Sequence, residues 1–195
     1  MKYGRWPCAV LLLAVAAVVA PGAAAQTTTT APGAPRLDKP LIVVSAPDAA
    51  GWVRLLRASG AAARIGTLDE ALDRPAALFS GALSLSPDQR GRIRAAVSDG
   101  KRAVVAGDAL LADVGLQRSA DRSVTSARMA GLDGEARWAP SVSVRPLQGA
   151  SLTPVATSGE AVLVGVTAVG KGQVLALGVD PLAPGRDGHD LLPAG

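Results

Sequence analysis

Cysteine, histidine and aromatic residues are nearly absent from this sequence. Its 195 residues include one cysteine and one histidine, and aromatic residues make up 3% of a chain that is 49% apolar. Any core must therefore be aliphatic, built mainly from alanine, valine and leucine. The composition also excludes a collagen, a coiled coil, a disulfide scaffold and a long disordered chain.

The first 25 residues have the pattern of a secretory signal peptide. Lys2 and Arg5 give a positive start, Ala9–Ala20 is an apolar run, and small residues at 23–25 allow cleavage before Gln26. The apolar run is short for a membrane span. We therefore predict a secreted, extracytoplasmic protein with no membrane contact after cleavage. An uncleaved N-terminal anchor is the alternative.

Cleavage would change the charge and the thiol content. Loss of Lys2 and Arg5 lowers the formal net charge from +4 to +2, so the high pI does not indicate a nucleic-acid partner. The basic residues are also scattered, with few aromatics to stack on bases. Cys8 leaves too, so the mature chain can have no disulfide, no cysteine-bound metal and no cysteine nucleophile.

Residues 26–39 are rich in threonine, proline and alanine and show no apolar period, which predicts a linker. A domain over 40–195 follows. Its first half alternates strand-like and helix-like segments, which favours an α/β fold with parallel strands and right-handed crossovers. The expected strands are 41–44, 63–67, 76–80 and 102–106. The expected helices run from Asp48 to Gly60, from Ser86 to Gly100 with Gln89 completing a capping box, and over 109–114.

The second half is strand-rich. Segments 124–129, 136–147, 152–156 and 160–169 are predicted to form an antiparallel β-meander attached to the parallel sheet. Segment 173–179 is predicted to return as a central or near-central strand. The chain stops after residue 195 where a doubly wound sheet would place a covering helix, so we expect that final helix to be missing and the domain to be C-terminally truncated.

Two segments resemble a known superfamily. Asp99–Gly107 (DGKRAVVAG) and Gly170–Pro181 (GKGQVLALGVDP) are similar to segments of the class I glutamine-amidotransferase-like superfamily, in particular its non-catalytic members attached to secreted carbohydrate-active enzymes, such as the trimerisation domain of some β-galactosidases. The resemblance covers roughly residues 40–190. It implies a flavodoxin-like parallel sheet and an accessory or binding role.

The sequence departs from the catalytic members of that superfamily. They carry a cysteine on the tight turn after a central strand, where this chain has Gly107-Asp108-Ala109, and His189 lies beyond the last strand. Thiolate amidotransfer is therefore excluded. We assign no catalytic residue, metal ligand or cofactor, because a nucleophile elbow is also absent and His189 with its two neighbouring aspartates is too small a ligand set for zinc.

Three carboxylates follow predicted strands and are candidate ligand-binding residues: Asp48, Asp108 and Asp180. Ligands of an open parallel sheet bind beyond the carboxyl ends of its strands, so these side chains could hold a cation or sugar hydroxyls. The alternative is that Asp48 and Asp108 cap helices and Asp180 sits in a turn. Trp52 and Trp138 could stack on sugars, but packing is the simpler expectation.

These features favour a secreted, non-catalytic accessory domain of a cell-surface carbohydrate-processing protein. Its partner would be another protein domain or a second copy, with carbohydrate as a possible ligand. One alternative is a metal-assisted hydrolase or deacetylase that uses the aspartate-lined edge. Another is a structural protein of the cell envelope.

Overall fold

The computed structural model describes residues 40–131 and 135–182 of the chain; at Ala136 and 138–140 it describes the backbone alone. The predicted signal peptide (1–25) and linker (26–39) lie outside the described residues. So do His189 and the place of the expected missing helix. No described helix is long and apolar enough to cross a membrane.

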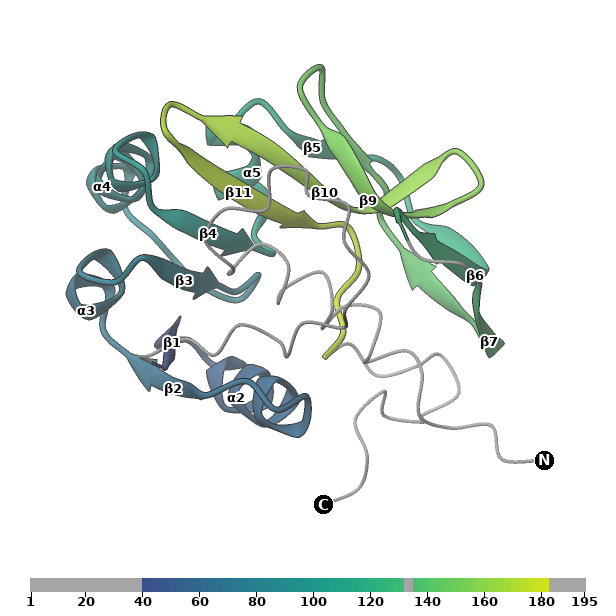
Figure 1. Ribbon diagram of the computed structural model, residues 1–195, viewed down its shortest axis with the longest axis horizontal. Coiled ribbons are helices and arrows are strands. Elements are labelled where there is room, and N and C mark those ends of the chain that lie inside the picture. The colour runs from purple at the N-terminus through teal and green to yellow at the C-terminus, as the bar shows by residue number, and fades with distance from the viewer. Residues whose placement is uncertain (1–39, 132–134, 183–195) are drawn as a thin grey trace, which may run out of the picture.

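The first half of the domain forms parallel strands, as predicted. Five strands lie side by side in the order β2-β1-β3-β4-β11, and every neighbouring pair is parallel (Figure 1). The run LIVV is buried at all four positions because both faces of this sheet are covered. The bounds are β1 Leu41–Val44, β2 Ala63–Gly66, β3 Ala76–Phe79, β4 Arg102–Val105 and β11 Gly172–Leu177.

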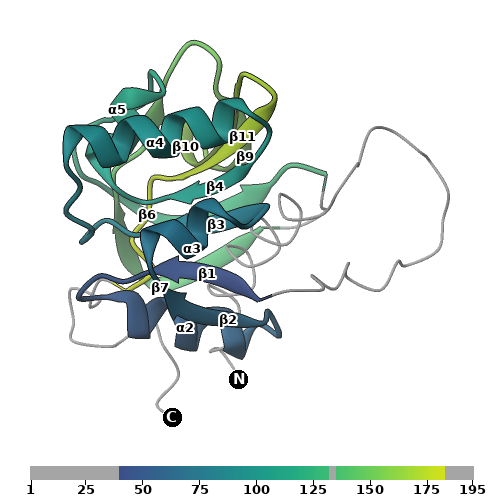
Figure 2. The same ribbon diagram turned by 90° about the vertical axis from the view of Figure 1, so that its left-hand side faces the viewer.

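Helices cover the two faces. On one face Leu41 and Val43 of β1 join a cluster with Trp52 of α2; on the other Ile42 and Val44 join a cluster with residues of α3, α4 and α5. In Figure 2, α3 and α4 lie on the near side of the strands. The bounds are α2 Ala49–Ala58, α3 Leu68–Leu72, α4 Pro87–Ser98 and α5 Asp108–Asp113. The molecule is thus an α/β protein.

The predicted N-terminus of α4 is confirmed in its details. Ser86 Oγ accepts a hydrogen bond from the Gln89 backbone N–H at 3.2 Å, and Gln89 Oε1 accepts one from the Ser86 N–H at 2.8 Å. The two bonds satisfy backbone donors that a helix start leaves free. Helix α3 was not predicted, although Thr67 and Glu70 form the same reciprocal cap there.

The second half is antiparallel and joins the parallel half through β11, which pairs with β4 on one side and β10 on the other. The predicted central position of this segment is therefore confirmed. The strands are β5 Gln117–Arg118, β6 Arg122–Met129, β7 Ala136–Val144, β8 Leu147–Gln148, β9 Thr153–Ser158 and β10 Ala161–Val169. The whole is one mixed, strand-rich sheet.

The expected meander is wrong in its strand order. The strands run β11-β10-β9-β6-β7, so β6 lies between β9 and β7 and the chain does not pass from each strand to its neighbour. The predicted strand over 136–147 also divides into β7 and β8, because Pro146 has no N–H to donate to a ladder. The short β8 then pairs with β10 and β5.

The turn Gly170-Lys171-Gly172 packs against the end of α4. Lys171 N–H donates to Ser98 O at 2.8 Å, and Gly170 has a φ of +59°. A Cβ on either glycine would lie inside 3.0 Å of α4 backbone atoms. The two glycines therefore allow the β10–β11 turn to rest directly on the helix end.

Candidate functional site

The loops after β1, β3, β4 and β11 gather at one edge of the sheet, because parallel strands end on the same side. The three predicted site residues, Asp48, Asp108 and Asp180, lie on these loops. Two of them act on one side chain: Asp108 lies 3.0 Å from the guanidinium of Arg118, and the charges of Asp108 and Asp180 both favour the charged form of that guanidinium and raise its pKa. Asp48 follows β1, which is separated from β4 by β3, and it belongs to a different network.

Asp48 is held by two side chains. Ser80, which follows β3 and is 1% exposed, donates from Oγ to Asp48 Oδ1 at 2.6 Å. Trp52 Nε1, on the first turns of α2, donates to Oδ2 at 3.1 Å. Asp48 occupies the N-cap position of α2, but its carboxylate makes no cap hydrogen bond and accepts from Ser80 and Trp52 instead. Trp52 is 1% exposed and is a packed anchor of its helix.

Asp108 is the first residue of α5, after Gly107 at the N-cap. Its Oδ1 lies 3.0 Å from Nη1 of Arg118, and its Oδ2 accepts from Nη1 of Arg145 at 2.8 Å. Asp180 is exposed, and its Oδ1 accepts the N–H of Leu182 at 2.9 Å, which closes a turn around Pro181. Each of these carboxylates therefore already has a hydrogen-bond donor within the chain.

Arg118 is the central side chain of this edge, and the sequence offered no signal for it. It comes from the two-residue strand β5 and donates to the carbonyls of Ala106 and Leu177, beyond the end of β4 and at the end of β11. Its side chain is 12% exposed. Burial lowers the pKa of the Arg118 guanidinium from its ordinary value, and Asp108 opposes that shift.

Asp108 binds both Arg118 and Arg145 at this edge. Arg118 and Arg145 supply positive charge to the Asp108 carboxylate, and Arg118 also donates to the strand-end carbonyls of Ala106 and Leu177. Among the described residues, no group of three or more histidine, cysteine, aspartate or glutamate side chains could hold a metal ion. Trp138, the other aromatic candidate, has a side chain outside the described part.

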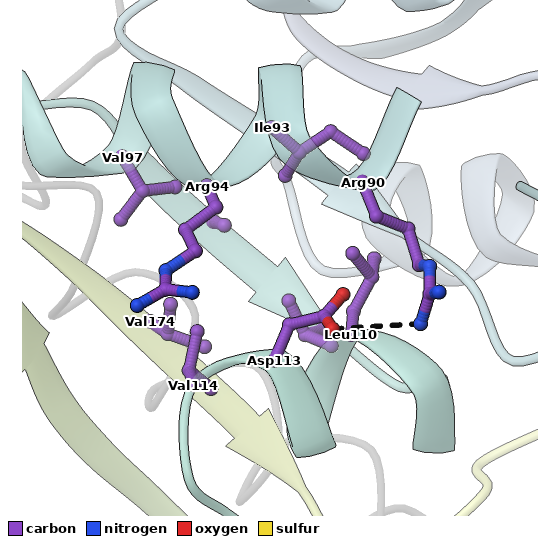
Figure 3. A pocket seen from close by; sticks show the side chains of 10 residues that line it. Arg90, Ile93, Arg94, Val97, Leu110, Asp113, Val114 and Val174 are labelled. Carbon is purple, nitrogen blue, oxygen red and sulfur yellow. Dashed lines mark hydrogen bonds and ion pairs between the residues drawn. The ribbon is translucent and has the colours of Figure 1, made fainter. Parts of the chain in front are cut away.

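A small pocket lies away from this edge, between α4 and α5 (Figure 3). Its floor is apolar and includes Val105 and Val174, and Arg90 Nη1 pairs with Asp113 Oδ1 across it at 3.4 Å. Arg90 Nε and Asp113 Oδ2 have no hydrogen-bond partner among the described residues. None of the predicted site residues lines the pocket.

Removal of the Asp48 carboxylate tests how much its hydrogen bonds with Ser80 and Trp52 stabilise the protein. We expect Asp48→Ala to lower the free energy of unfolding by about 2–3 kcal/mol, because the buried Ser80 hydroxyl and the Trp52 N–H would both lose their acceptor. Ser80→Ala should cost only about 1 kcal/mol, because Asp48 keeps the Trp52 bond. Urea unfolding followed by circular dichroism measures both values.

Asp180→Ala is the matched control, because it removes an exposed turn carboxylate from the same edge; it should cost about 0.5 kcal/mol or less. Equal losses for Asp48→Ala and Asp180→Ala would contradict a stabilising role for the Asp48 network.

Comparison with known proteins places the fold. No family model and no curated protein matches the chain. Among solved structures, a β-galactosidase from Rahnella sp. R3 superimposes with a TM-score of 0.55 at 15% identity, over 74% of this chain and 29% of that one. A β-galactosidase from the haloarchaeon Halorubrum lacusprofundi gives 0.53 at 17% identity, over 73% and 28%. A catalytic mutant of Gan42B, a GH42 β-galactosidase from G. stearothermophilus, gives 0.54 at 11% identity, over 74% and 28%.

These identities show a shared fold and nothing finer. In each pair the match spans less than a third of the β-galactosidase chain. This chain is therefore similar to one part of those enzymes.

Proposed function

We propose that this chain is an exported, non-catalytic accessory domain of a carbohydrate-processing protein, related in fold to the class I glutamine-amidotransferase-like superfamily. Two observations support the fold. The parallel strand order β2-β1-β3-β4-β11 corresponds to the flavodoxin-like order 2-1-3-4-5, and helices cover both faces. The similarity to part of three β-galactosidase chains supports the association with carbohydrate processing.

The observation that carries the non-catalytic role is the turn from β4 into α5. In the superfamily that the sequence resembles, the catalytic members place their cysteine on this turn, where this chain has Gly107-Asp108-Ala109. The carboxylate of Asp108 is held at 3.0 and 2.8 Å by two arginines, and Arg118 occupies the space between the ends of β4 and β11. A reacting group at this turn would have to displace an ion pair and two strand-end hydrogen bonds.

The same edge offers little to the rival metal-assisted hydrolase. Such an enzyme needs carboxylates free to bind the cation. Here Asp108 is paired with arginines, and Asp48 accepts from Ser80 and Trp52. We therefore propose the accessory role, and the test described below can detect a metal-assisted hydrolase. The partner is a second protein domain or a second copy of this chain.

The test uses the chain secreted from cells and purified. We expect its N-terminus to begin at Gln26, and we expect no hydrolysis of L-glutamine or of p-nitrophenyl-β-D-galactoside above that of a mock preparation, with or without added Zn²⁺ or Mg²⁺. Sedimentation velocity over a hundredfold concentration range tests self-association. Calorimetric titration with galacto-oligosaccharides tests carbohydrate binding.

Turnover of either substrate that disappears in Asp108→Asn or Asp48→Asn would overturn the non-catalytic role, and a need for metal would favour the hydrolase. A monomer that binds no carbohydrate would exclude a second copy of this chain and galacto-oligosaccharides as binding partners, and would leave a second protein domain as the partner that the accessory role needs. If the measured mass of the purified chain included residues 1–25, the signal segment would be uncleaved and would act as an N-terminal anchor.

A further inference from the structure

β2 is the outermost strand on one side of the sheet, and it pairs with β1 alone among the described strands. Its open side, the β2 edge, is distinct from the strand ends that carry Asp48, Asp108 and Asp180. Leu41 N–H donates to Ala62 O, and Ser45 N–H donates to Gly66 O. In a parallel ladder, alternate residues direct both backbone groups to the same side. Arg64 therefore faces β1 with its N–H and C=O, as Gly66 does, while Ala63 and Ile65 direct theirs outward, away from the sheet.

Both outward carbonyls are already occupied. Arg57 Nε, from the last turn of α2, donates to Ala63 O at 3.0 Å, and Arg64 Nη1 donates to Ile65 O at 3.2 Å. These are the two acceptors that an added strand would need in order to pair with β2. Two arginine side chains thus stand where the backbone of that strand would lie.

Arg64 is held in this position by Glu70. The two side chains form a forked pair, with Nη2 3.0 Å from Oε1 and Nη1 3.3 Å from Oε2. The hydrogen bond from Arg64 holds the pKa of the Glu70 carboxyl below its ordinary value, because the guanidinium favours the charged carboxylate. Glu70 is fixed in turn by the reciprocal cap of α3.

The same edge carries an exposed apolar side chain. Ile65 is 44% exposed, more than any other large apolar side chain in the part of the chain that the structure describes. An open strand edge with an exposed β-branched residue is a template for pairing with another chain. The edge is also self-complementary, because Ala63 and Ile65 each present one donor and one acceptor to a second β2 related by a two-fold axis.

We propose that Arg57 and Arg64 cap the β2 edge and keep it from pairing with β2 of a second copy of this chain. Without them, the free carbonyls of Ala63 and Ile65 and the side chain of Ile65 define an antiparallel β2–β2 contact. Any partner of the intact protein then joins through another surface, whichever partner that is. This inference does not depend on the proposed function.

The experiment compares Arg57→Ala/Arg64→Ala with the control Arg54→Ala/Arg94→Ala. The control removes the same charge from exposed helix positions and leaves the edge capped. We expect the edge variant alone to gain a concentration-dependent dimer in sedimentation velocity. We also expect hydrogen exchange at the Ala63 and Ile65 amides to slow at least tenfold (a shift of about 1.4 kcal/mol) in that dimer and to recover on dilution.

A third change locates the contact. Ile65→Lys in the edge variant should return the chain to the association state of the unmodified protein, because a charged side chain opposes edge pairing. The single variants Arg57→Ala and Arg64→Ala free one carbonyl each and should show intermediate association; they decide the question if the double variant does not fold. Unchanged association and exchange in the edge variants, or equal association in the control, would overturn the proposal.

Discussion

Replacement of Gly172 by alanine is expected to destabilise the protein by about 3–5 kcal/mol. A Cβ at this position would lie inside 3.0 Å of the carbonyl oxygens of Val97 and Lys101, and both are backbone atoms that no rotamer change can move away. The turn would have to lift from the end of α4, which breaks the Lys171–Ser98 hydrogen bond. A domain of this size has a total stability of about 5–15 kcal/mol, so the loss should be visible as a large drop in the urea midpoint.

Gly91→Ala is the control, and it should have the opposite sign. Gly91 is an exposed residue within α4, and a Cβ there meets nothing within 4 Å. Alanine should therefore stabilise the helix by about 0.5–1 kcal/mol by restricting the unfolded chain. If Gly172→Ala were as harmless as Gly91→Ala, the close packing of the turn on α4 would be wrong.

The Gly172 contact also explains one of the motifs in the sequence. In GKGQVLALG, Gly172 approaches α4, and a Cβ on Gly178 would approach Arg145 O at 2.7 Å. The apolar residues between them are buried in the central strand β11. The motif thus has a packing role that holds whatever the protein binds.

Elements with strong local signals were predictable. Ser86, Pro87 and Gln89 mark the start of α4 within four residues, and the short apolar run of β1, which ends before Pro47 and is rich in β-branched residues, favours a buried strand. Helix α3 has five residues and too little apolar period to stand out. The pair Thr67 and Glu70 was nevertheless a readable capping signal that could have identified it.

Long-range pairing was not predictable in the same way. The order of β9, β6 and β7 depends on contacts such as Arg128 with Thr157, and no local pattern specifies that pairing. The candidate site shows the same limit. Topology placed Asp108 and Asp180 at one edge because both follow strands of one parallel sheet. Arg118 reaches carbonyls 12 and 59 residues away and lies in a strand too short to show any period.

Arg118→Ala is expected to cost about 2–4 kcal/mol of unfolding free energy. The substitution leaves Ala106 O and Leu177 O without this donor at the ends of two neighbouring strands, and it leaves Asp108 with Arg145 as its cationic partner. Arg118→Lys should recover only part of the loss, because one ammonium cannot bridge both carbonyls and the carboxylate in the planar geometry of a guanidinium.

Arg145→Ala is the matched variant, since it removes the other partner of Asp108. The Arg145 side chain is 45% exposed against 12% for Arg118. Its loss should cost about 0.5–1 kcal/mol and should shrink further in 0.5 M salt, because exposed pairs are screened. The Arg118→Ala loss should persist in that salt, because neutral carbonyls and burial account for most of it. If the two variants lost the same free energy and responded equally to salt, Arg118 would be one more surface cation, and its hydrogen bonds to Ala106 O and Leu177 O would not stabilise the ends of β4 and β11. A persistent, larger loss for Arg118 would instead show that this largely buried side chain holds the ends of β4 and β11 together through their carbonyls.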